Sequence, residues 1–262
     1  MRRFTLAADR VDGTRVTFDG DESRHLARVL RLRPGDTVVA TDGAGRDYTV
    51  RLETVGERAT GTVLGVAAGA SESPLAITLV QGIPKGDRME AIVRAATELG
   101  VRRVVPALAE RTVVRLEPAR WRERARRWQR VAREAAKQSR RAVIPEVDAP
   151  RPLVDCLATT RADLALCVWE GQAPTLAEAL ARAGGPPRTA ALLVGPEGGL
   201  ARSEVEAARE GGWTIAHLGP RILRTETAGP AVIAILQATF GDMGGPGDMG
   251  GLGGHLGAPQ VH

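Results

Sequence analysis

The chain is poor in lysine, cysteine and aromatic residues, and it has no long apolar run. Its two cysteines, Cys156 and Cys167, fit neither a zinc-ligand spacing nor a disulfide framework, so we expect reduced core side chains and no metal site. No stretch approaches the roughly 18 consecutive apolar residues of a membrane span. Residues 1–10 are polar and charged, unlike a secretion signal. We therefore expect a cytoplasmic protein without membrane contact.

Arginine dominates the charge. Of 36 basic residues only Lys85 and Lys137 are lysines, so 34 are arginines, and the net charge is +5. The planar guanidinium suits phosphate because it offers paired donors. A GC-rich genome would also explain this count, so the position of the charge is more informative than its total.

Residues 1–70 carry short β-strand patterns separated by turn residues such as Asp-Gly and Pro-Gly. The predicted strands are 3–6, 15–18, 37–41, 48–53 and 61–66, with one helix at 22–30. These features predict a small β-barrel domain, followed by a linker at 69–74.

Residues 74–240 alternate strands with helices, the pattern of an α/β domain. The predicted strands are 75–81, 101–106, 163–169, 189–194 and 213–218. One predicted helix begins after Asp87, which forms a capping box with Glu90. The other predicted helices are 175–183, 203–211 and 225–240. The Gly-rich residues 241–262 bury too little apolar surface to fold, so we predict a disordered tail.

Residues 118–141 hold ten basic and two acidic residues. Trp121, Ala125, Trp128 and Ala132 recur at helical spacing and give the predicted helix one apolar face. A solvated helix surface is one interpretation, but a surplus of eight positive charges favours a polyanion such as RNA. The candidate RNA contacts are Arg122, Arg126, Arg130, Arg133 and Lys137.

A second basic group comprises Arg24, His25, Arg28 and Arg31, just before a Pro-Gly turn. On a helix these side chains lie close together and could bind a phosphate backbone. By itself this pattern is weak, since His25 could equally be an ordinary surface histidine.

Two loops carry the strongest signals of chemistry. In the first, VGPEGG at 194–199, an apolar strand runs into a Gly-rich turn around Glu197. In the second, LGPRILRTETA at 218–228, a strand end leads into a helix for which Thr225 is a candidate N-cap. Ligands of open α/β sheets bind beyond the carboxyl ends of strands. Neither loop has the glycine spacing of a Walker A or a Rossmann motif.

Together these two loops resemble those of the RsmE family, the 16S ribosomal RNA uridine N3-methyltransferases. Further similarity lies in HLARVLR at 25–31, PGD at 34–36, QGIPKGD at 81–87 and ELGV at 98–101. The resemblance covers about residues 1–240.

The resemblance implies an α/β SPOUT methyltransferase domain with a trefoil knot, preceded by a PUA-like β-barrel, in a homodimer. It also implies S-adenosylmethionine as cofactor and 16S ribosomal RNA, or the small ribosomal subunit, as partner. The residues that would line the cofactor pocket are Trp169, Val194, Gly195, Leu218, Gly219, Ile222, Leu223 and Thr225.

For the reaction itself we expect Arg224 to stabilise negative charge on the uracil oxygens, and Glu226 or Glu197 to accept the N3 proton. Glu197 could instead only organise its loop. Three other functions are considered: a non-catalytic RNA-binding ribosome-assembly factor, a SPOUT enzyme for another RNA target such as a ribose 2′-hydroxyl, and, more distantly, a nucleotide-binding oxidoreductase.

Overall fold

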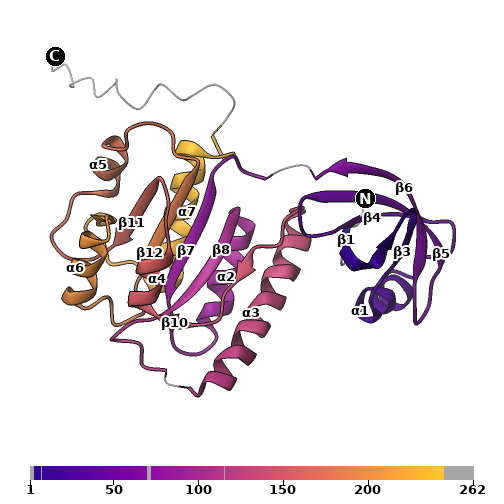
Figure 1. Cartoon of the computed structure of the whole chain (residues 1–262), viewed down its shortest axis with the longest axis horizontal. Coiled ribbons are helices and arrows are strands. Elements are labelled where there is room, and N and C mark those ends of the chain that lie inside the picture. Colours follow the sequence, from indigo (N-terminus) through magenta and orange to yellow (C-terminus); the bar gives the residue numbers. More distant parts are fainter. Residues whose placement is uncertain (1–2, 7, 70–71, 115, 245–262) are drawn as a thin grey trace, which may run out of the picture.

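The computed structural model of the chain describes residues 3–6, 8–69, 72–114 and 116–244. The residues form two lobes, each built on its own sheet (Figure 1). Most of the segment predicted to be disordered, from residue 245 onward, lies outside the described residues.

The N-terminal lobe is a six-stranded sheet in the order β1-β4-β5-β6-β3-β2, curled around a core that includes Phe4, Phe18, Leu26 and Leu52. All five predicted strands are present, and the two-residue β2 is additional. The strands are β1 (Arg3–Thr5), β2 (Val11–Asp12), β3 (Arg15–Thr17), β4 (Thr37–Thr41), β5 (Arg46–Thr54) and β6 (Thr60–Ala68).

The single helix predicted at 22–30 is divided in two. Helix α1 (Gly20–Arg24) begins at Asp19, whose carboxylate accepts a hydrogen bond from the Glu22 amide, and a π-helical turn follows at His25–Val29. In this turn Leu26 is buried in the barrel core while Arg28 is exposed. Such π-helical turns are frequent at functional sites.

The second lobe is an α/β sandwich on a sheet in the order β10-β8-β7-β12-β11-β13, with every pairing parallel and β9 beside β8. Parallel sheets are covered on both faces, which explains the continuous apolar strands. The strands are β7 (Ala76–Gly82), β8 (Val101–Leu108), β9 (Glu146–Val147), β10 (Arg151–Pro152), β11 (Leu164–Val168), β12 (Thr189–Val194) and β13 (Thr214–Ala216).

Six helices cover the two faces of this sheet (Figure 1). One face packs against α2 (Arg88–Glu98), α3 (Pro118–Gln138), α5 (Leu176–Ala181) and α7 (Thr225–Phe240). The other packs against α4 (Leu153–Thr159) and α6 (Arg202–Glu210). Both cysteines are buried and free, as expected.

Two of the predicted helix caps are wrong. Asp87 precedes α2 but makes no side-chain capping bond, and its carboxylate lies 3.9 Å from Arg127 Nη2 of α3. The Glu90 carboxylate pairs with Nε of the same arginine, 2.7 Å away. A charged partner on a neighbouring helix binds a carboxylate more strongly than a neutral backbone amide does. The residue that precedes α7 is Arg224, so Thr225 is not its N-cap.

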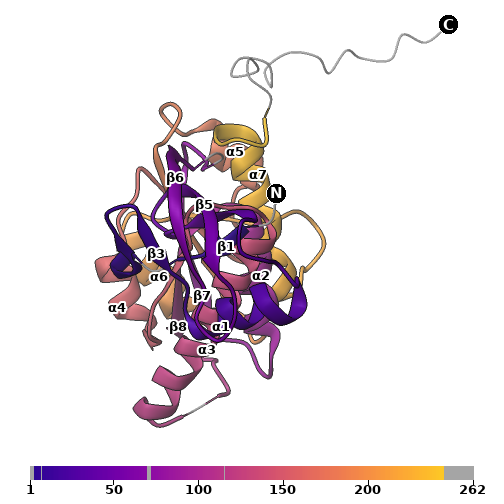
Figure 2. The ribbon, with the colours of Figure 1, turned by 90° about the vertical axis from the view of Figure 1, so that its right-hand side faces the viewer.

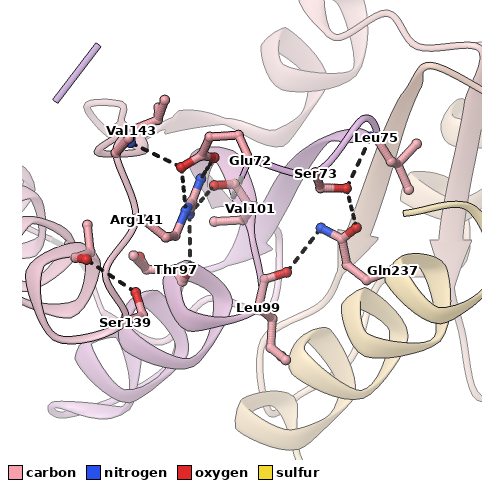
Figure 3. A network of polar contacts seen from close by, with 12 residues as sticks. Glu72, Ser73, Leu75, Thr97, Leu99, Val101, Ser139, Arg141, Val143 and Gln237 are labelled. Atoms are coloured by element: carbon pink, nitrogen blue, oxygen red, sulfur yellow. Dashed lines mark hydrogen bonds and ion pairs between the residues drawn. The ribbon is translucent and has the colours of Figure 1, made fainter. Parts of the chain in front are cut away.

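The carboxyl end of α3 joins the two lobes (Figures 1 and 2). Lys137 Nζ lies 2.8 and 2.9 Å from the two carboxylate oxygens of Glu22 in the barrel. Just beyond the helix, Arg141 pairs with Glu72 at 2.7 Å and donates to the carbonyls of Thr97 and Val101 (Figure 3). The Lys137–Glu22 contact therefore fastens α3 to the barrel, and the Arg141 contacts hold the end of α3 against α2, β8 and the segment before β7.

Candidate active site at the carboxyl ends of three strands

A cavity of about 1150 Å³ opens where β12, β11 and β13 end side by side. The loops after these three strands form its walls, together with the start of α7 and Arg88 from α2. Parallel strands bring their carboxyl ends to one edge of the sheet, which is why segments far apart in sequence meet here. All of the predicted catalytic and cofactor residues line the cavity: Trp169, Val194, Gly195, Glu197, Leu218, Gly219, Ile222, Leu223, Arg224, Thr225 and Glu226.

The loop after β12 passes very close to the end of β7. A Cβ atom on Gly82 would lie 2.5 Å from the backbone nitrogen of Pro196, so this position requires glycine. Gly199 has a φ of +69°, and a Cβ there would lie 2.6 Å from a carboxylate oxygen of Glu170. Glycine at these two positions therefore allows the backbone to approach Pro196 and Glu170 closely, which a larger side chain would prevent.

Thr225 connects the two pocket loops. Its hydroxyl donates to the Gly195 carbonyl at 2.7 Å and accepts from Gln81 Nε2 at 2.9 Å. Both side chains are buried. Thr225 thus holds the first loop against the start of α7 and does not cap the helix.

Four charged side chains form a cluster at the cavity wall. Arg88 is paired with Glu197 and lies 3.8 Å from a Glu226 carboxylate oxygen, and Arg224 lies 3.9 Å from the same Glu226 oxygen. Glu197 also accepts a 2.9 Å hydrogen bond from the Lys85 amide. Burial acts to raise the pKa of Glu197, but hydrogen bonds from backbone amides and from Arg88 outweigh it and hold this pKa below its usual value. Glu197 is therefore anionic and already occupied by donors.

The apolar part of the cavity comes from Val194, Leu218, Leu223 and Trp169. Val194 is buried, whereas Ile222 is 86% exposed and Arg224 is exposed at 83% of its side chain. The cavity therefore has an apolar floor and a charged, open rim.

Most of the predicted RNA contacts lie on the surface. Arg122, Arg126, Arg130 and Arg133, here called the α3 arginine row, are exposed at helical spacing, and no described residue forms an ion pair with them. Arg24, Arg28 and Arg31 are exposed on the barrel, while His25 is half-buried with its ring edge-on to Phe4.

Lys137 differs from the other predicted RNA contacts. Its side chain is 13% exposed and its ammonium is bound by Glu22, itself 6% exposed. A carboxylate thus already occupies the ammonium through two short contacts, which argues against the predicted RNA contact at Lys137. The residue fastens α3 to the barrel.

Comparisons with known proteins agree with this geometry. The RNA methyltransferase domain family matches residues 71–237, and the RNA methyltransferase PUA domain family matches residues 18–59. The ribosomal RNA small subunit methyltransferase E of Mycobacterium tuberculosis is 36% identical over 82% of this chain and 83% of its own length. That of Synechocystis is 34% identical over 90% and 77%. The chain belongs to the RsmE family.

Solved structures of RsmE proteins have the same fold. A ribosomal RNA small subunit methyltransferase E from Neisseria gonorrhoeae, bound to S-adenosyl methionine, superimposes with a TM-score of 0.83 at 35% identity, covering 92% of this chain and 99% of that one. A putative methyltransferase from Legionella pneumophila, in complex with the same cofactor, gives 0.83 at 29% identity over 92% and 98%. The expected PUA-like barrel followed by an α/β RNA methyltransferase domain is confirmed.

Sequence reasoning missed several polar residues in and beneath the cavity of this RsmE protein, among them Arg88, His217 and Gln81. Arg88 stands in the first turn of a helix, where the helix dipole disfavours a cation. Gln81 interrupts an apolar strand. Both irregularities are visible in the sequence and could have marked these residues as functional. His217, whose Nδ1 accepts from the Gly219 amide at 3.0 Å, carried no signal.

Two searches complete the description of this RsmE protein. Within the described residues no group of three or more His, Cys, Asp or Glu side chains could hold a metal ion. None of the described helices is long and apolar enough to cross a membrane.

Proposed function

We propose that this RsmE protein transfers a methyl group from S-adenosylmethionine to N3 of a uridine in 16S ribosomal RNA. The observation that carries the proposal is the cavity that Glu226 and Arg224 line together with glycine-containing loops at the carboxyl ends of the strands. Membership of the RsmE family supports the ribosomal substrate, and the Neisseria relative bound to S-adenosyl methionine supports the cofactor.

The cavity fits this cofactor in size and chemistry. Apolar side chains would take the adenine ring, and the turns at Gly195 and Gly219 bring backbone close to a ligand. Carboxylates at the rim would favour a cationic sulfonium. S-adenosylmethionine supplies an electrophilic methyl group. The residues proposed to hold it are Trp169, Val194, Gly195, Leu218, Gly219, Ile222, Leu223 and Thr225.

Of the two carboxylates, Glu226 is the proposed general base. Glu197 already accepts from the Lys85 amide and pairs with Arg88, and its pKa lies below the usual value, which makes it a poor proton acceptor. The cations nearest to Glu226 lie 3.8 and 3.9 Å away, so its oxygens can turn to a substrate. Glu197 then serves to organise its loop.

In the proposed step the uracil N3 proton passes to Glu226, the new N3–carbon bond forms and the methyl–sulfur bond breaks. Negative charge that develops on the uracil oxygens is stabilised by the guanidinium of Arg224. Because Arg224 is 83% exposed at its side chain, it can move to a base that enters from solvent. Alignment of N3 with the methyl group is the main requirement of such a displacement.

We propose that the RNA lies across both lobes. The α3 arginine row and the barrel residues Arg24, His25, Arg28 and Arg31 would bind phosphates while the target uridine leaves its stack. The Lys137–Glu22 contact supports this arrangement because it brings the carboxyl end of α3 to α1. In this proposal residues 1–70 form the RNA-binding domain and 74–240 the methyltransferase domain.

The resemblance also leads us to propose a trefoil knot around the cavity, a homodimer and a cytoplasmic location, where ribosomal RNA is modified. For the dimer, further support comes from apolar exposure: Ile222 at the rim is 86% exposed and Ile235 on α7 is 42% exposed.

The test begins with titration calorimetry of the protein with S-adenosylmethionine, using NAD and ATP as controls. We expect selective micromolar binding. Incubation with small-subunit RNA and mass mapping should then place one methyl group on a uracil base. A methyl group on a ribose would support the 2′-hydroxyl alternative, and no cofactor binding would support the RNA-binding assembly factor.

A further inference from the structure

Gln81 is a polar side chain at a place where the fold favours an apolar one. It lies near the carboxyl end of β7, a central strand, between the buried Val80 and the tight Gly82 position, and its exposure is 0%. Burying an amide without full hydrogen bonding destabilises the folded state. Its retention therefore needs an explanation other than burial.

The amide nitrogen of Gln81 contacts its own strand and two segments that are distant in sequence. Nε2 donates to the Gly82 carbonyl at 3.0 Å and to the Thr225 hydroxyl at 2.9 Å, and lies 3.5 Å from the Gly195 carbonyl. Thr225 in turn donates to Gly195 at 2.7 Å. One buried amide thus joins β7, the loop after β12 and the start of α7.

The amide oxygen of Gln81 connects no segments. Gln81 Oε1 is buried and has no hydrogen-bond partner among the described residues. Exchanging the positions of oxygen and nitrogen would lose the bonds to the Gly82 and Gly195 carbonyls, which can only accept. The side chain therefore leaves its oxygen unsatisfied, while its nitrogen makes hydrogen bonds beneath the cavity. Its contribution is the connection between the segments that these bonds join.

We propose that Gln81 is a positioning residue for the cofactor: it holds the Gly195 loop against the start of α7 in the geometry that binds S-adenosylmethionine. This inference rests on the proposed function of the cavity. Gln81 itself does not line the cavity and acts through Gly195 and Thr225, which do.

The test is the variant Gln81→Leu, which keeps the approximate volume and removes both amide atoms. We expect its dissociation constant and KM for S-adenosylmethionine to rise at least tenfold, with kcat changed less than threefold. The unfolding temperature should change little, because the unsatisfied oxygen is removed together with the bonds. In this variant without cofactor, the amides of Gly195 and of residues 197–200 should exchange hydrogen faster than in the wild type.

Gln237→Leu is the matched control. Gln237 is also 0% exposed, but its amide donates to the Leu99 carbonyl at 3.1 Å and accepts from Ser73 Oγ at 2.6 Å, away from the cavity lining (Figure 3). Its loss should lower the unfolding temperature and leave cofactor affinity within twofold.

Cofactor binding by Gln81→Leu within twofold of the wild type would overturn the inference. If wild-type protein binds no cofactor, the proposed function itself fails, which is a different result. If Gln81→Leu does not fold, Gln81→Met repeats the test, because methionine has nearly the length of glutamine and lacks the amide donor. Its affinity for S-adenosylmethionine should also fall at least tenfold, and affinity within twofold of the wild type would overturn the inference.

Discussion

Replacing Lys137 by methionine removes the cation from a buried ion pair that joins α3 to the barrel. Nζ lies 2.8 and 2.9 Å from the Glu22 carboxylate oxygens, and it also lies 5.5 Å from the centre of the Phe4 ring. Removing one partner of a buried pair costs about 3–5 kcal/mol because the other charge stays buried. Glu22 would keep its bonds from the Thr5 amide and hydroxyl, at 3.2 and 2.7 Å.

Because these donors remain, we expect the free energy of unfolding to fall by about 3 kcal/mol, the lower end of that range. For a domain of this size, that lowers the unfolding temperature by roughly 6–12 °C. Thermal unfolding followed by circular dichroism at neutral pH measures the shift. Arg133→Met is the control, because Arg133 is on the same helix, exposed and without an ion pair to any described residue.

The double variant Glu22→Gln with Lys137→Met should recover about 1 kcal/mol or more, since no uncompensated charge then remains. A loss below about 1 kcal/mol for Lys137→Met, the value of an exposed ion pair, would refute the reasoning. RNA binding, measured well below the transition, should keep its salt dependence in Lys137→Met.

Four further predictions concern the site and the RNA surface. Glu226→Gln should lower kcat at least a hundredfold and leave the calorimetric affinity for S-adenosylmethionine within twofold; unchanged kcat would exclude Glu226 as the base. Gly82→Ala should weaken that affinity because its Cβ would lie 2.5 Å from Pro196. Unchanged affinity would show that the loop after β12 can move away without harm to cofactor binding. Exchanging the whole α3 arginine row for glutamine should reduce the slope of log affinity against log salt by up to about 3, and an unchanged slope would exclude these phosphate contacts. Because the folded protein holds the pKa of Glu197 below its usual 4.5, this residue stabilises the fold above that pH, and the contribution disappears as pH falls through the folded pKa. Glu197→Gln should therefore flatten the acid limb of stability against pH, and an equally steep limb would contradict this account.

Local patterns located the regular elements well where the pattern was long or strongly marked. β12 (Thr189–Val194) and α7 (Thr225–Phe240) have the predicted bounds, because a buried strand and an apolar helix each have an unambiguous pattern between turn residues. The helix predicted from the spacing of Trp121, Ala125, Trp128 and Ala132 is α3, which begins at Pro118 because proline suits the first turn. The short elements β9, β10 and α4 were missed because two to seven residues carry little periodicity.

Side-chain partners were predicted less well than elements. Glu90 looked like a capping residue but is bound by Arg127 of another helix, and Lys137 looked like an RNA contact but is bound by Glu22. In both cases a residue more than 30 positions away in sequence decided the outcome, which local spacing cannot show.

The sequence by itself determined the two-sheet organisation, the family through its two loop motifs, and the residues that gather around the cavity, because strand ends, glycine turns and helix periodicity are local properties of the chain. Only the tertiary structure decided which donors occupy Glu197, that Gln81 contacts Thr225 and Arg88 contacts Glu197, and which basic residues face solvent. Those outcomes depend on which segments the parallel sheet and the packing of α3 on the barrel bring within hydrogen-bonding distance.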